Sequence, residues 1–279
     1  TGMTDEISTD YGDNARYMNT AKNSSNMGFH RWHTLYRLIR QANLFIENVK
    51  VIPPSGIDAE QLTESEVDEM IANANFMIAY YHYLLFEQYG PIPIMDRAMS
   101  AIEKLDMPRN SVDEVVQFID TKLVDAIKTL HQTPYDDENY RAMPTKGVAL
   151  AVRAKLWMYA ASPLFNGGYK DALTLENKDG TRLFSDADPS KWDKAKNILK
   201  DFIDYANQGH YDLFRVYNDG KIDPDASVYE LFQQYNDEVI WATANTGWGG
   251  VEWGDRFERR ATPRSEPNGL GSTSVVQEL

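Results

Sequence analysis

The sequence predicts a mainly α protein in which paired helices pack beside an irregular, loop-rich region that holds few short strands. Three observations lead to this fold class. Five stretches repeat apolar residues every three or four positions, the spacing that places one face of a helix against a core. The first two stretches, and the third and fourth, are joined by short connections typical of helical hairpins. Beyond Tyr211 the helical period is lost.

The first two predicted helices cover residues 29–50 and 67–93. The first has one apolar face and ends before a Pro-Pro pair, which cannot continue a helix. The second is the longest, and its last turns are rich in tyrosine. It should stop sharply, because Gly90 can adopt a left-handed cap conformation and Pro91 breaks the hydrogen-bond ladder. We expect the other helices to be organised around this one.

Three further helices are predicted over residues 111–130, 144–162 and 189–209. The first of these begins with Ser111 followed three positions later by Glu114, the pattern of a capping box. The second is apolar on almost every side, which predicts that it is the most enclosed helix of the set. The third opens on a proline and closes at a glycine, as helices commonly do.

The remainder of the chain has a different character. Residues 237–243 form a short β-favouring run, and the rest of the tail is rich in Gly, Trp, Pro and Ser, which predicts an irregular region. We therefore divide the chain into a helical region, residues 1–210, and the start of a loop-rich region, residues 211–279. The paired helices are tetratricopeptide-like, although the strict consensus of that repeat is not met.

Composition excludes several classes of function. The chain of 279 residues carries a net charge of −14, so phosphate backbones and anionic lipid surfaces would be repelled. It contains no cysteine, which rules out disulfides, thiolate metal sites and a cysteine nucleophile. No run is long and apolar enough to span a membrane, and residues 1–28 lack the pattern of a signal peptide.

Six groups of short motifs follow one another in a fixed order, and together they are specific. They are Trp32-His33-Thr34-Leu35-Tyr36 with Ala42-Asn43; Ala79-Tyr80-Tyr81 with Tyr89-Gly90-Pro91-Ile92-Pro93; Arg109-Asn110-Ser111; Thr145-Lys146-Gly147 with Ala154-Lys155-Leu156-Trp157 and Ser162-Pro163; Trp192 with Tyr211-Asp212-Leu213; and Glu238-Val239-Ile240-Trp241. With these motifs the chain resembles the SusD/RagB family, the surface glycan-binding lipoproteins of starch-utilisation-type systems in bacteria.

The resemblance implies a non-catalytic protein that binds oligosaccharides or polysaccharides at the cell-surface face of the outer membrane. It further implies delivery of the glycan to a SusC-type TonB-dependent transporter, and a lipid anchor in the full-length protein. No cofactor and no nucleic acid partner are implied. We expect the sequence to be a fragment, because the resemblance looks partial at both ends. Inside the motifs the chain departs from the family at Asn73, Asn75, Ile78 and Lys122, where the family more often has charged residues that could form a network.

The residues themselves suggest where a sugar would bind. A sugar presents an apolar face and a rim of hydroxyls, so a binder needs flat aromatic rings beside carboxylates, amides and guanidinium groups. Two loop segments offer this combination, and the resemblance points to similar loop residues. The alternative is that the tryptophans only cover the helical core. The candidate glycan-binding residues are Tyr11, Asp13, Asn14, Tyr17, Trp248, Trp253, Asp255 and Arg256.

Other groups of residues are interpreted without a functional role. Trp32, Trp157, Trp192 and Trp241 lie on apolar faces or in the predicted strand, which favours core packing. His30 and His33 are one helical turn apart and could share a metal ion, but no third ligand of the right type is close and the other three histidines are scattered, so no metal ligand is predicted. Two acidic loops, residues 135–139 and 218–225, lack the spacing of a calcium loop and are interpreted as solvated turns.

Two alternative functions stay open at this point. A helical-barrel glycoside hydrolase also combines helices with tryptophans and carboxylates, and Glu252 and Asp255 would then be the first candidates for the catalytic pair. A helical-repeat adaptor that binds peptides is the weaker alternative. Release of sugar from a polysaccharide would identify the hydrolase, and binding of peptides but not glycans would identify the adaptor.

Overall fold

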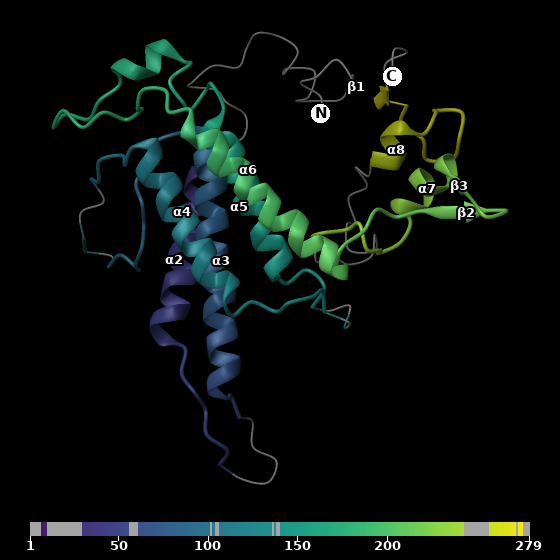
Figure 1. Ribbon diagram of the computed structural model, residues 1–279, viewed down its shortest axis with the longest axis horizontal. Helices are drawn as coiled ribbons and strands as arrows, with labels where there is room; N and C mark the ends of the chain where they lie inside the picture. The colour runs from purple at the N-terminus through teal and green to yellow at the C-terminus, as the bar shows by residue number, and fades with distance from the viewer. Residues whose placement is uncertain are drawn as a thin grey trace. The chain divides into compact units, whose positions relative to one another are not determined.

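Figure 1 shows the computed structural model of the chain, which describes residues 7–9, 30–55, 61–100, 102–103, 106–135, 137, 140–242, 257–271 and 273–275. The chain divides into two compact units. One consists of residues 31–244, called the helical unit below, and the other joins residues 1–30 to residues 245–279. The predicted division of the sequence near residue 210 stays a prediction.

The helical unit confirms the mainly α fold and all five predicted helices, with ends that shift by a few residues. Each long helix packs against the next one along the chain, and α3 also contacts α5. The hairpin pairing predicted from the short connections is therefore present, within a continuous stack. The helices are α2 (Trp32–Asn48), α3 (Glu64–Tyr89), α4 (Val112–Ile127), α5 (Lys146–Ala161) and α6 (Ser190–Tyr205).

Local hydrogen bonds explain where the helices begin and end. The predicted capping box of α4 is formed: the backbone N–H of Ser111 donates to Glu114 at 2.7 Å, and the backbone N–H of Glu114 donates to the Ser111 hydroxyl at 3.3 Å. Thr63 and Glu66 form the same box on α3, which is why this helix begins three residues before the predicted Val67. At the other end, Gly90 has φ +70°, a conformation that other residues rarely adopt.

The core lies between α3 and its neighbours. Phe76, Leu85 and Phe86 of α3 are fully buried against apolar side chains of α2, α4 and α5. Most residues of α5 are buried, which confirms that it is the most enclosed of the predicted helices. At Lys122, where the sequence departs from the SusD/RagB pattern, the ammonium donates to the Asn75 side chain at 3.0 Å, so an uncharged polar partner takes the place of an ion pair.

The chain after α6 has more regular structure than expected. One turn of π-helix, η2 (Ala206–His210), leads to a hairpin of β2 (Val216–Asn218) and β3 (Lys221–Asp223), and then to α7 (Pro224–Leu231). The hairpin turn has positive φ at Asp219 and Gly220, and the Asp223 side chain accepts from the Ala226 N–H to cap α7. The acidic loop 218–225 is therefore a turn and a helix cap.

The predicted strand over residues 237–243 is wrong within its described part, residues 237–242, which form a turn and irregular backbone. Its apolar residues pack on the helices instead. The Trp241 ring lies edge-on to Phe76 and Tyr80, and its indole N–H donates to the carbonyl of Ala142 at 2.9 Å. The β-favouring composition therefore indicates apolar residues that are half-buried. A strand has such residues, and so does this irregular segment packed on the helices.

Two of the four tryptophans predicted for the core are exposed. Trp157 is buried and Trp241 packs on the core, which confirms those predictions. Trp32 is 36% exposed and Trp192 is 49% exposed, so the predictions for them are wrong. Both lie in the first turn of a helix, where the apolar stripe continues beyond the side chains that could cover it.

The other unit is described in part. Strand β1 (Ile7–Thr9) pairs antiparallel with β4 (Thr273–Val275), with Ser8 opposite Ser274. The short helix α8 (Phe257–Ala261) is followed by a turn in which the Leu270 N–H donates to the carbonyl of Arg259 at 2.7 Å. The pairing joins residues near the two ends of the sequence.

In the helical unit, residues 170–174 add a short 3₁₀ helix, η1 (Lys170–Thr174).

Candidate functional site

The candidate glycan-binding residues taken from the sequence cannot be placed. All of them lie outside the described residues, and so does Glu252. These residues stay a prediction: Tyr11, Asp13, Asn14, Tyr17, Trp248, Trp253, Asp255 and Arg256. The helical unit nevertheless contains cavities whose linings can be compared with the chemistry expected of a sugar site.

A cavity of about 320 Å³ lies where three loops of the helical unit meet. We call it the loop cavity. It combines aromatic rings with a guanidinium, an amide and a carboxylate, which is the combination expected for a sugar. Its lining consists of Thr133, Pro134, Tyr135, Arg141, Gly209, His210, Tyr211, Tyr235, Asn236, Asp237 and Val239.

Tyr235 is the most accessible ring of the loop cavity. The residue is 36% exposed, and the guanidinium carbon of Arg141 lies 5.2 Å from the centre of its ring, close enough for a cation–π contact. Partial burial raises the pKa of Tyr235, and so does the nearby Tyr211. The phenol therefore stays protonated and can donate as well as accept a hydrogen bond.

Tyr135 forms the facing part of the wall. Its ring stacks on His131 with centres 4.3 Å apart, and its hydroxyl donates to the Glu69 carboxylate on α3. Burial raises the pKa of Tyr135, and the hydrogen bond to Glu69 raises it further. These contacts fix the ring, so that a ligand meets a surface whose conformation is already set.

Hydrogen bonds within residues 231–238 hold the third part of the wall. The Asn236 amide donates to the carbonyl of Leu231 at 2.9 Å, and its oxygen accepts from the Glu238 N–H at 3.1 Å. The Glu238 carboxylate in turn accepts from the N–H of Phe214 at 2.8 Å. The turn that carries Tyr235 and Asp237 is therefore hydrogen-bonded to the irregular segment just before β2.

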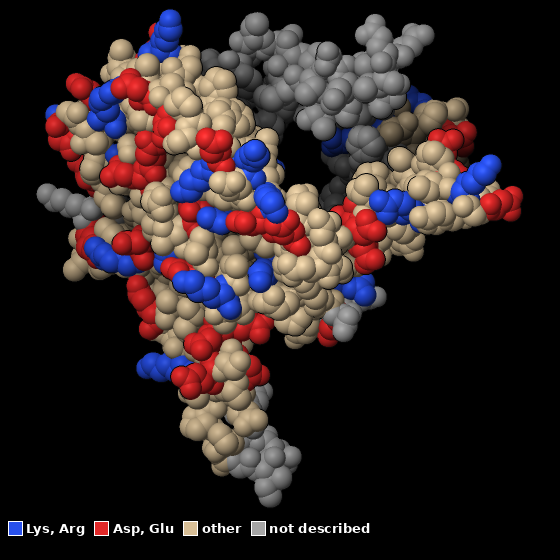
Figure 2. Space-filling view, viewed as in Figure 1, with Lys and Arg blue, Asp and Glu red and all other residues tan. Residues whose placement is uncertain are grey.

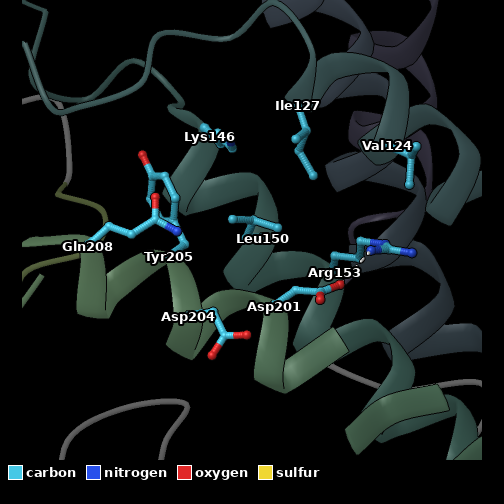
Figure 3. A pocket seen from close by; sticks show the side chains of 9 residues that line it. All are labelled: Val124, Ile127, Lys146, Leu150, Arg153, Asp201, Asp204, Tyr205 and Gln208. Atoms are coloured by element: carbon cyan, nitrogen blue, oxygen red, sulfur yellow. Dashed lines mark ion pairs between the residues drawn. The ribbon is translucent and has the colours of Figure 1, made fainter. Parts of the chain in front are cut away.

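A second cavity, of about 350 Å³, lies between α4, α5 and the end of α6; we call it the helical groove (Figure 3). Val124, Ile127 and Leu150 form its apolar part. Its charged part includes Arg153, whose guanidinium lies 3.7 Å from the Asp201 carboxylate, the ion pair marked in Figure 3. The other lining residues are Lys146, Asp204, Tyr205 and Gln208.

The two cavities are separated by a pair of stacked rings. Tyr205 lines the helical groove and His210 lines the loop cavity, and their rings are nearly parallel with centres 4.0 Å apart. The Lys146 ammonium lies 5.3 Å from the centre of the Tyr205 ring, and the Tyr205 hydroxyl donates to the carbonyl of Gln132. The wall between the cavities is thus rigid and aromatic.

Acidic and basic side chains are interspersed on the face of the helical unit shown in Figure 2. Among the described residues, no group of three or more acidic or histidine side chains is arranged to hold a metal ion. No helix within the described ranges has the length and apolar composition needed to cross a membrane.

The residues of the loop cavity were missed at the sequence level, although a signal was present. The same rule that selected the eight candidates, an aromatic residue beside Asn or Asp in a loop, also fits Tyr135-Asp136 and Tyr235-Asn236-Asp237. Tyr135 begins the acidic segment 135–139, which has the character of a solvated turn, and Tyr235 stands outside the glycine-rich segment that carries Trp248. Which loops approach one another is a property of the helical stack, and local patterns do not report it.

The fold and its cavities define a class of protein: a stack of helical hairpins whose loops form cavities lined by aromatic and polar side chains. Residues 3–158 match the family model of SusD-like proteins described as starch-binding and associating with the outer membrane. The match spans more than half of the sequence, so this chain belongs to the SusD-like family.

Comparisons with individual proteins agree with this assignment. The SusD-like protein P2 of Formosa agariphila is 29% identical over 128 residues, which is 46% of this chain and 23% of that protein. The solved structure of BT4246 is 25% identical, with a TM-score of 0.69 over 88% of this chain and 46% of its own. A SusD-like protein from Bacteroides fragilis shares the fold, with a TM-score of 0.59 over 88% of this chain and 41% of its own at 14% identity. The chain spans less than half the length of these relatives.

Proposed function

We propose that this chain is part of a non-catalytic glycan-binding protein at the cell-surface face of the outer membrane. Membership of a family described as starch-binding and associating with the outer membrane supports the proposal. The single observation that carries it is the loop cavity, in which the Tyr235 ring, the Arg141 guanidinium and the Asp237 carboxylate lie together. The apolar face of a sugar ring would stack on a tyrosine, and its hydroxyls would reach the polar groups.

The net charge of the chain narrows the ligand to neutral glycans. A chain with a net charge of −14 would repel a polyanionic polysaccharide at long range. The loop cavity contains one carboxylate and one guanidinium side chain, a pairing suited to hydroxyl groups, which both donate and accept. The predicted loop residues, Trp248 and Trp253 among them, belong to the same proposal as additional platforms.

Calorimetry with a panel of neutral and acidic polysaccharides tests the proposal. For a neutral glycan that binds, Tyr235→Ala should weaken the affinity by about 2- to 10-fold, the loss expected for one stacked ring. Tyr229→Ala is the matched control, because Tyr229 is 69% exposed in the same segment and lines none of the cavities described above. Equal losses in the two variants would contradict the site, and no binding to any glycan would contradict the function.

The same panel distinguishes binding from hydrolysis. Hydrolysis of a glycosidic bond needs two carboxyl groups across the substrate. The loop cavity has one, and the two in the helical groove, Asp201 and Asp204, are exposed and face Arg153 and Lys200. Glu252 and Asp255, the first candidates for a catalytic pair, lie outside the described residues. The proposed non-catalytic role predicts that no reducing sugar is released from any glycan that binds. Measurable turnover would refute a non-catalytic role.

We further propose delivery of the bound glycan to a SusC-type TonB-dependent transporter, and attachment of the full-length protein by a lipid anchor. Both follow from the family resemblance. Co-purification of the full-length protein with such a transporter from detergent-solubilised outer membranes is the expected result. Recovery of the protein without a transporter from intact, glycan-loaded membranes would contradict delivery and leave glycan binding unaffected.

A further inference from the structure

Trp32 is presented on the surface of the helical unit in a fixed orientation. It is 36% exposed, and it lines a cavity of about 240 Å³ together with His33, Tyr36, Pro93, Met95 and Met107. An indole on the wall of an apolar cavity can stack on a flat ligand. Sequence periodicity assigned this residue to the core, so its exposure needs another explanation.

Three hydrogen bonds and two ring contacts hold Trp32 and its neighbours in place. The backbone N–H groups of Arg31 and Trp32 both donate to the Tyr89 hydroxyl at 3.2 Å. The Trp32 ring lies edge-on to Tyr89, with centres 5.1 Å apart, and tilted against Tyr36 at 5.0 Å. The Tyr36 hydroxyl donates to the carbonyl of Pro93 at 2.7 Å. A ring fixed in this way loses little conformational freedom when a ligand binds.

Met107 of the aromatic cavity also lines a second, more polar cavity of about 550 Å³. The charged residues in the lining of this cavity are Asp106, Arg109, Glu176, Lys178 and Asp179. The Asn177 amide donates to the carbonyl of Arg109 at 2.8 Å and joins the two loops that form this cavity. Arg109, Glu176 and Lys178 are exposed, so a ligand in this cavity can reach their side chains.

We propose that these two connected cavities form a second saccharide-binding groove, separate from the loop cavity. One sugar ring would lie on Trp32 between Tyr36 and Met107, and hydroxyls of the next unit would meet Arg109, Glu176 and Lys178. Together the cavities reach the volume of about 300–1,000 Å³ typical of small-ligand sites, which the aromatic cavity alone does not. The mixed charges favour a neutral oligosaccharide of at least two units. This inference rests on the proposed function.

The indole signal of Trp32 in a heteronuclear NMR spectrum reports on this groove alone. The signal is assigned as the one missing from Trp32→Phe, and neutral di- to hexasaccharides from the glycans that bind in calorimetry are titrated in. We expect the Trp32 indole signal to shift on saturation in the parent chain and in Tyr235→Ala. If no oligosaccharide shifts it, while Tyr235→Ala still weakens binding, the second groove is overturned and the proposed function stands.

Calorimetry gives the matching affinity test. Trp32→Ala and Arg109→Gln should each lower the affinity of the second groove for an oligosaccharide by about 2- to 10-fold, whereas Trp32→Phe should retain most of this affinity. Trp192→Ala is the matched control, because Trp192 is 49% exposed at the start of α6 and lines none of the described cavities. Arg109→Gln keeps the test valid if Trp32→Ala unfolds. Unchanged affinity in Arg109→Gln, and in Trp32→Ala where that variant folds, together with an unshifted Trp32 indole signal overturns the groove. No glycan binding by the parent chain overturns both proposals.

Discussion

His82 is buried on α3 without a charged partner, and its two ring nitrogens are both engaged. One nitrogen, Nδ1, lies 2.7 Å from the carbonyl of Ile78, and Nε2 accepts from the N–H of Met95 at 3.1 Å. Nδ1 must therefore carry the proton in the neutral ring, and protonation of Nε2 would break the second bond. Burial lowers the pKa of His82 from its usual value of about 6.5 to about 4, with Lys122 adding to the effect.

We predict that His82 makes the helical unit sensitive to mild acid. The pKa of His82 is lower in the folded chain than in the unfolded chain. As the pH falls below about 6.5, His82 therefore binds a proton in the unfolded chain but stays neutral in the folded chain. The free energy of unfolding should then fall between pH 6.5 and about 4, by on the order of 3 kcal/mol at most. Urea unfolding at a series of pH values measures this slope.

The variant His82→Gln isolates that contribution, since glutamine can donate and accept but does not titrate in this range. Its stability should vary less with pH than that of the parent chain, whereas His33→Gln, which changes an exposed histidine, should leave the slope unaltered. A slope in His82→Gln as steep as in the parent would show that other groups, such as carboxylates, carry the acid sensitivity.

Asp120 is the second residue whose role is set by burial. Its carboxylate is 7% exposed and accepts from Arg153 Nε at 2.6 Å and from the Trp157 indole at 2.8 Å, with Lys194 Nζ 3.9 Å away. The carboxylate therefore joins α4, α5 and α6 at one point. It also orients Arg153, which lines the helical groove.

We predict that Asp120→Asn lowers the free energy of unfolding by about 3 kcal/mol, the lower end of the loss when one partner of a buried ion pair is removed. The lower end is chosen because Arg153 keeps a contact with Asp201 at 3.7 Å. The midpoint of urea unfolding should fall accordingly. The control Asp204→Asn breaks an exposed pair with Lys200 and should change stability by less than about 1 kcal/mol. Similar losses in both variants would refute a special role for the buried carboxylate.

At the scale of single elements, the ends of α3 and α4 illustrate how far local sequence reaches. Ser111 and Glu114 were enough to predict the start of α4. Thr63 and Glu66 have the same spacing, but the start of α3 was placed at Val67 because the apolar period begins there. A cap lies outside the apolar stripe, so periodicity alone places such a helix start too late.

Removal of this cap should destabilise the first turn of α3. Thr63→Ala deletes the hydroxyl that accepts from the Glu66 N–H, and a loss of about 1 kcal/mol is expected. Amide hydrogen exchange should accelerate over residues 64–67, with a smaller effect toward the middle of the helix. Ser65→Ala, in the same exposed turn but without a capping role, is the control. Equal acceleration in both would mean that the cap contributes nothing.

The two exposed tryptophans show where the helical period misleads. Trp32 and Trp192 fit the apolar stripes of their helices, yet each lies in a first turn where the neighbouring elements no longer cover the stripe. Trp157, on the same kind of stripe in the middle of α5, is buried. The period reports the direction in which a side chain points, whereas coverage depends on how far the packed neighbours extend.

At the scale of the whole molecule, the frame could be predicted from the sequence and the site could not. Five amphipathic stretches and their short connections specify a stack of helices, because most contacts in the stack join helices that are neighbours along the chain. The loop cavity joins Tyr135, His210 and Tyr235, which are far apart in sequence and come together through that stack. Nothing local to any of these residues indicates the other two.

The order of packing in the helical unit has a consequence for how its binding surfaces can diversify. Each long helix packs mainly against the one before and the one after it, so contacts between the helices set much of their arrangement. Exposed parts of the connecting segments, such as residues 178–182, can therefore change in length or composition while the helices keep their positions. Proteins with this fold could acquire a different ligand through changes in the loops, while the helices stay the same.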